Sequence, residues 1–149
     1  MAGPRTASYP PRHSGELGVS LKILIVDDSA HIRRLLRFFI EHRTDWQVCG
    51  EAENGKVGVE KVAELHPHAV ILDLSMPVMN GLEAAREIAR IAPHVPIVMF
   101  TMHTSEQLRK EAQAAGIKEV ISKTDTIADH LIVSLQNLCA PLRSAAARS

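Results

Sequence analysis

The sequence predicts an α/β domain in which a parallel β-sheet is covered by helices on both faces. Short apolar runs, which suit buried strands, alternate five times along the chain with segments of helical periodicity. Repeated βα units with right-handed crossovers build such a sheet. The chain has 149 residues, of which 46% are hydrophobic, enough for one domain with a substantial core.

The central strand is expected over residues 69–73, where four apolar residues end on the carboxylate of Asp73. Met76-Pro77 and Asn80-Gly81 then break the chain into a turn. Open α/β sheets bind ligands beyond the carboxyl ends of their strands, so Asp73 is a candidate functional residue.

The first repeat begins with an apolar, β-branched strand over residues 21–26, which stops at Asp27 and Asp28. Ser29 is a good N-cap for the following helix. Apolar residues recur along this helix every three or four positions and should face the core, whereas its other side should face solvent. The apolar set is Ile32, Leu35, Leu36 and Phe39, and the solvent-facing set is Arg33, Arg34 and Arg37.

The later repeats keep the same order. Further strands are expected over residues 46–52, 97–101 and 119–122, and further helices over residues 56–65, 82–91, 105–115 and 127–138. Pro67 and Gly116 end two of these helices, and Asp125 caps the last one. These boundaries predict a flexible N-terminal tail over residues 1–20, a folded domain over 21–139 and a frayed C-terminal tail over 140–149.

Polar residues follow four of the predicted strands. Asp27 and Asp28 end the first strand, Asp73 the third, Thr101 the fourth and Lys123 the fifth. The carboxyl ends of parallel strands share one edge of a sheet, so these side chains should meet in one shallow pocket. Each residue alone has an ordinary structural explanation, but their joint convergence favours a functional site.

The charges of the predicted pocket favour a bound cation. Three carboxylates this close repel one another, and one would take up a proton near neutral pH unless a cation joined them. Mg²⁺ prefers such oxygen ligands, and Asp28, Asp73 and the backbone carbonyl of Ser75 could supply them, with Asp27 binding directly or through water. Asp73 is then the candidate nucleophile and phosphoacceptor, with Lys123 and Thr101 facing the phosphoryl oxygens.

This set of residues resembles the receiver domain of two-component response regulators. The resemblance covers about residues 21–138 and rests on Asp27-Asp28, the block Asp73-Leu-Ser-Met-Pro-Val-Met-Asn-Gly81, Thr101 and Lys123. The family's acid pair, phosphoacceptor, switch hydroxyl and lysine fall on these positions in turn. The resemblance implies a flavodoxin-like (βα)5 fold with strand order 2-1-3-4-5 and the phosphorylation site at the switch point.

The resemblance also implies a function. Asp73 would accept a phosphoryl group from a sensor histidine kinase or a histidine phosphotransfer protein, with Mg²⁺, and later lose it by hydrolysis. Phosphorylation would switch a face made of the fourth helix, fifth strand and fifth helix, which would bind an unknown downstream protein or a second copy of the chain. The chain is therefore expected to be a stand-alone signalling or phosphate-relay module and not an enzyme.

Three positions depart from the commonest family pattern. Thr124-Asp125 follows the lysine where many receivers have proline, as in regulators that carry a LuxR-type helix-turn-helix, although no such output domain is expected here. Val120 replaces the usual tyrosine or phenylalanine of the switch, and Met102 replaces the alanine that often follows the hydroxyl.

Alternative functions remain open. Within the family, the chain could be the receiver fragment of a DNA-binding regulator or a phosphate reservoir. A Mg²⁺-dependent phosphatase resembling haloacid-dehalogenase-like hydrolases would also use an aspartate nucleophile, but it would need a second aspartate where Ser75 stands. A phosphate-independent interaction module is disfavoured by the intact set of five site residues.

Composition excludes further classes. Lys+Arg and Asp+Glu number 17 each, which gives a net charge of +0 and argues against direct nucleic-acid binding. Cys49 and Cys139 lack metal-ligand spacing and are expected to be reduced thiols. The chain shows neither a membrane-length apolar run nor a secretory signal, so a cytoplasmic location without membrane contact is expected.

Overall fold

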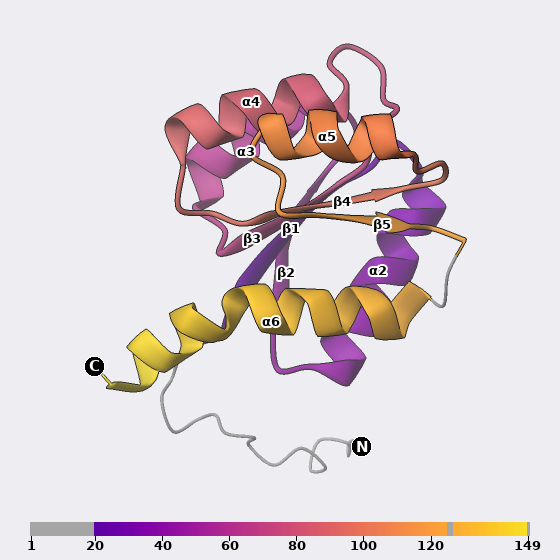
Figure 1. The fold of residues 1–149 in the computed structure, drawn as a ribbon. Coiled ribbons are helices and arrows are strands. Elements are labelled where there is room, and N and C mark those ends of the chain that lie inside the picture. The colour runs from indigo at the N-terminus through magenta and orange to yellow at the C-terminus, as the bar shows by residue number, and fades with distance from the viewer. Residues whose placement is uncertain (1–19, 125–126, 149) are drawn as a thin grey trace.

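Five parallel strands form one sheet between two layers of helices in the computed structural model, which describes residues 20–124 and 127–148 (Figure 1). The strands are β1 (Lys22–Val26), β2 (Gln47–Ala52), β3 (Ala69–Leu72), β4 (Ile97–Thr101) and β5 (Glu119–Ser122). The helices are α2 (Ala30–Arg43), α3 (Gly55–Leu65), α4 (Gly81–Ile91), α5 (Glu106–Ala114) and α6 (Ile127–Arg148). The strand order is β2-β1-β3-β4-β5, which confirms the predicted flavodoxin-like topology.

The sheet is buried on both faces because successive side chains of each strand point to opposite sides. In β1, Leu24 and Val26 belong to one core and Ile23 and Ile25 to the other, and all four are fully buried. Helices α3, α4 and α5 cover the first face, and α2 and α6 cover the second (Figure 1). This double coverage explains why the strands are continuous apolar runs and not alternating ones.

The predicted helix ends are mostly confirmed. The hydroxyl of Ser29 accepts a hydrogen bond from the Ile32 N–H, and Ser105 accepts one from Leu108 in the same way. Gly116 has a φ of 95°, as expected of a glycine that ends a helix. The expected cap at Asp125 and residues 1–19 of the expected N-terminal tail lie outside the described residues.

The last helix is longer than the sequence predicted. Residues 140–148, expected to form a frayed tail, continue α6 to Arg148. The alanines at residues 145–147 have the highest intrinsic helix propensity and favour helix in the last part of this segment. No helix in the part of the chain that the structure describes is long and apolar enough to cross a membrane.

Two predictions about helix faces are wrong. The spacing of apolar residues predicts that Val59, Val62 and Ala63 form the inward face of α3, but Ala63 is exposed, whereas Gly55 and Gly58 of the same helix are buried. A Cβ at Gly58 would lie 2.9 Å from a methyl group of Val26, so glycine lets α3 approach β1 closely. On α2, Arg33 does not face solvent: its side chain is only 16% exposed and is paired with Glu51 of β2.

Candidate functional site

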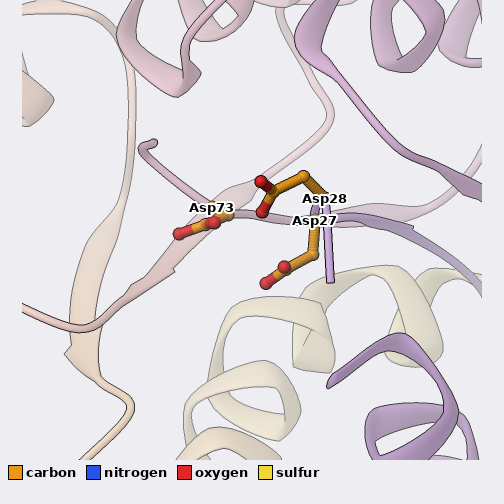
Figure 2. Close-up of side chains that lie close together, drawn as sticks. All are labelled: Asp27, Asp28 and Asp73. Carbon is orange, nitrogen blue, oxygen red and sulfur yellow. The ribbon is translucent and has the colours of Figure 1, made fainter. Parts of the chain in front are cut away.

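Three carboxylates meet at the edge of the sheet where β1 and β3 end. Asp27, Asp28 and Asp73 each place one oxygen within 4.8 Å of the others (Figure 2). Asp27 and Asp73 are buried, with 2% and 6% of their surfaces exposed, whereas Asp28 is exposed. The predicted convergence of these three residues is therefore what the structure shows.

Lys123 joins the cluster from the end of β5. Its Nζ lies 2.8 Å from Asp27 Oδ2 and 3.4 Å from Asp73 Oδ1, and its side chain is 8% exposed. The ammonium also lies 5.8 Å from the centre of the Phe100 ring, within range of a cation–π contact. Lys123 is thus a buried bridge between two carboxylates and not a surface charge.

Backbone N–H groups hold the two buried carboxylates in place. Asp27 Oδ1 accepts from the Ser29 N–H at 2.9 Å, and Asp73 Oδ1 accepts from the Leu74 N–H at 2.8 Å. Both donors belong to the turns that immediately follow the strands. Such local bonds offset part of the cost of burying a carboxylate and fix its orientation.

Thr101 and Ser75 occupy the same edge in different ways. Thr101 is 4% exposed at the end of β4, and its carbonyl accepts a 2.8 Å hydrogen bond from the Lys123 N–H. This bond ties the ends of β4 and β5 together beside the carboxylates. Ser75 is exposed in the loop after β3. The roles expected of the Thr101 hydroxyl and the Ser75 carbonyl stay predictions.

Close backbone contacts shape the loop between β3 and α4. The Gly81 N–H donates to the Leu74 carbonyl at 2.8 Å, and a Cβ at Gly81 would collide with the Asp73 carbonyl oxygen. The Gly55 N–H donates to the Met79 carbonyl at 3.0 Å, which fastens the far side of the loop to α3. Glycine is needed at residue 81 because the loop passes directly over the backbone of Asp73.

The electrostatics of the pocket favour a bound cation. Burial, followed by the neighbouring charge of Asp27, raises the pKa of Asp73 from 3.8 to about 6, although Lys123 opposes this shift. One ammonium cannot balance three carboxylates. A hard divalent ion with oxygen ligands would remove the excess negative charge, so the residues present fit Mg²⁺.

Arg33 is a site residue that sequence reasoning missed. Its Nη1 donates a 2.6 Å hydrogen bond to the main-chain carbonyl of Asp27. Periodicity assigned Arg33 to the outer side of α2. The available signal was its position one turn after the N-cap Ser29, which places it beside the end of β1.

Comparisons with known proteins agree with this geometry. The family model described as "Response regulator receiver domain" matches residues 23–134. The chemotaxis protein CheY of Thermotoga maritima is 40% identical over 102 residues, which cover 68% of this chain and 84% of that protein. The crystal structure of a LuxR-family response regulator from Aurantimonas sp. SI85-9A1 superposes with a TM-score of 0.76 at 28% identity, covering 82% of this chain and 87% of that one.

Other relatives are much longer than this chain. A protein-glutamate methylesterase/protein-glutamine glutaminase 1 of Methanosarcina acetivorans is 44% identical over 94 residues. The aligned segment covers 63% of this chain but only 27% of that protein. The likeness therefore concerns one part of the longer protein.

Proposed function

Because this chain belongs to the family of response regulator receiver domains, we propose that it signals by accepting a phosphoryl group on Asp73. The observation that carries the proposal is the pair of contacts made by Lys123, which place an ammonium against the buried carboxylate of Asp73 and its neighbour Asp27. A phosphoryl group on Asp73 would arrive beside this positive charge. The donor would be a phosphohistidine of a sensor kinase or of a phosphotransfer protein.

The transfer step is a substitution at phosphorus. Leu74 and Lys123 both contact Asp73 Oδ1, so we expect the other oxygen, Oδ2, to attack. As the new P–O bond forms, the P–N bond of the donor breaks, and its electron pair returns to the imidazole, which then takes a proton from solvent. Hydrolysis reverses the state of Asp73: water attacks phosphorus, the P–O bond to Asp73 breaks and phosphate leaves.

The other residues would neutralise and position charge. Bound Mg²⁺ would supply charge neutralisation at the phosphoryl oxygens, held by Asp28, Asp73 and the Ser75 carbonyl, with Asp27 as a direct or water-mediated ligand. Lys123 would turn from Asp73 Oδ1 towards the incoming phosphoryl oxygens. The Thr101 hydroxyl, at the adjacent strand end, would donate to one of them.

The signal would be read at the face made of α5, β5 and α6. Both β5 and the Thr101 end of β4 connect directly to the pocket, because Thr101 pairs with Ser122 and bonds to Lys123. Val120 of β5 is 8% exposed and has no ring to move inward. We therefore propose that a change at this face starts from Thr101 and Lys123, and that a downstream protein or a second copy of the chain binds there.

Phosphorylation by a small donor tests the proposal. The wild-type chain and Asp73→Asn would be incubated with acetyl phosphate and Mg²⁺, and intact mass would report phosphoryl addition. Wild type should gain one phosphoryl group that hydrolyses slowly, and Asp73→Asn should gain none. Equal labelling of both proteins would refute Asp73 as the acceptor. Rapid turnover of varied phosphoesters would instead favour a hydrolase.

A further inference from the structure

Arg33 connects the edge strand β2 to the end of β1. Its Nε donates to Glu51 Oε1 at 2.9 Å, while its Nη1 donates to the carbonyl of Asp27 at 2.6 Å. The Arg33 side chain is 16% exposed and that of Glu51 is 26% exposed, so the pair is largely shielded from water. Planar guanidinium groups suit such a double contact, because their donors have fixed relative directions.

The orientation of the Asp27 carbonyl affects both acids of the pair, because this carbonyl belongs to the peptide unit that links Asp27 to Asp28. Fixing this oxygen fixes the plane of that peptide, and hence the direction in which Asp28 leaves the strand. The rest of Asp27 is held as well: its N–H donates to the Ala52 carbonyl at 3.0 Å, and its Oδ1 accepts from Ser29. Lys123 holds its Oδ2, and Arg33 supplies the restraint on its carbonyl.

We propose that Arg33 is a positioning residue for the metal site, which orients Asp27 and Asp28 by holding the carbonyl between them. The proposal rests on the Mg²⁺ site of the proposed function. Arg33 itself would not contact the ion. It would hold the acid pair in its binding orientation before the ion arrives, which lowers the entropic cost of metal binding. Residues that hydrogen-bond to metal ligands have this effect in other sites.

Arg37 provides a matched control on the same helix. It pairs with the same carboxylate, since its Nη2 lies 2.8 Å from Glu51 Oε2, and it also contacts Glu41 at 3.3 Å. Its described contacts do not include Asp27. A variant of Arg37 therefore removes a charge and a Glu51 ion pair from α2, yet leaves the carbonyl contact intact.

Charge and position predict opposite results for Arg33. As a cation near three carboxylates, Arg33 repels a metal ion, so its removal would tighten Mg²⁺ binding if charge dominated. If positioning dominates, its removal frees the Asp27–Asp28 peptide and weakens binding. Arg33→Lys separates the two effects, because it keeps the charge, whereas one ammonium cannot reproduce the fork between Glu51 and the carbonyl.

The experiment compares the wild-type chain, Arg33→Met, Arg33→Lys and Arg37→Met. Titration calorimetry would measure the Mg²⁺ affinity, and amide hydrogen exchange of metal-free protein would report the Ser29 N–H, which bonds to Asp27 Oδ1. We expect both Arg33 variants to bind Mg²⁺ about tenfold more weakly and to exchange the Ser29 amide faster. Arg37→Met should differ from wild type by less than about twofold.

Several outcomes would overturn the inference. Unchanged or tighter Mg²⁺ binding by Arg33→Lys, which keeps the charge, would show that position does not matter. Equal losses of Mg²⁺ affinity in Arg33→Met and Arg37→Met would show only a general loosening of α2. In both cases wild type would still bind Mg²⁺ and accept a phosphoryl group, so the proposed function would stand. If wild type itself failed to bind Mg²⁺, both proposals would fall. Should Arg33→Met not fold, Arg33→Lys decides alone.

Discussion

Lys123 lies closer to Asp27 than to Asp73: its Nζ is 2.8 Å from Asp27 Oδ2 and 3.4 Å from Asp73 Oδ1. The ammonium therefore acts first as the counterion of the most deeply buried acid of the site, which is 2% exposed. Its contact with the proposed phosphoacceptor is the looser of the two. This asymmetry leaves Lys123 able to turn towards a phosphoryl group without moving the backbone of β5.

Removing this ammonium should destabilise the metal-free protein. Lys123→Met leaves Asp27 and Asp73 buried without their counterion, and loss of one partner of a buried ion pair costs about 3 kcal/mol. Urea unfolding without metal measures the loss. Added Mg²⁺ should recover more stability in the variant than in wild type, because the ion replaces the missing charge. An equal effect of Mg²⁺ on both proteins would contradict this account.

Asp73→Asn should stabilise the metal-free protein at neutral pH. The pKa of Asp73 is about 6 in the folded state, whereas the ordinary pKa of an aspartate, expected in the unfolded chain, is 3.8. The folded state therefore binds a proton on Asp73 more tightly than the unfolded chain does. Keeping the carboxylate ionised therefore costs stability, by about 3 kcal/mol above pH 6. This penalty shrinks as the pH falls from 6 and disappears well below pH 3.8, where the carboxyl is protonated in both states.

The measurement is urea unfolding of wild type and Asp73→Asn in chelator between pH 4 and pH 8. The free energy of unfolding of Asp73→Asn should exceed that of wild type by an amount that grows with pH and levels off above about pH 6. A constant difference across this range would indicate that Asp73 does not titrate there. Asp129→Asn serves as a control, because that carboxylate is exposed on α6.

Mg²⁺ affinity should fall in acid. The proposed ligand Asp73 would bind the ion in its ionised form, and its pKa of about 6 places a proton in competition with the metal below that pH. Affinity should therefore be steady above about pH 7 and decrease by up to about tenfold per pH unit well below 6. Calorimetry at several pH values tests this, with proton release on binding expected near pH 6. Affinity that stays level down to pH 5 would argue against Asp73 as a ligand.

Replacing Val78 by asparagine should stabilise the protein, because Val78 has a strained backbone conformation. It has a φ of 72°, in the left-handed region that β-branched residues avoid, and its side chain packs little because it is 75% exposed. Val78→Asn relieves this strain and should raise the free energy of unfolding by about 1 kcal/mol. Thermal unfolding measures the change. Val133→Asn, at another exposed position, on α6, should show no such gain.

Local sequence patterns determined much of this protein. Apolar runs placed the five strands, and Ser29, Ser105 and Gly116 marked helix ends, because these signals act within a few residues. Parallel pairing then required that residues after different strands share one edge. The sequence alone therefore groups Asp27, Asp28, Asp73 and Lys123, which the structure brings together.

Only the tertiary structure decided which of these groups pair and which helix residues support them. The preference of Lys123 for Asp27, the link from Glu51 through Arg33 to the Asp27 carbonyl, and the glycine-lined approach of α3 to β1 depend on register and helix rotation. Periodicity distinguishes an inner from an outer side of α2, but it does not reveal that β2 places a carboxylate beneath the outer side. The contact between Arg33 and Glu51, 18 positions apart, is set by the packing of α2 on the sheet, and no local pattern encodes it.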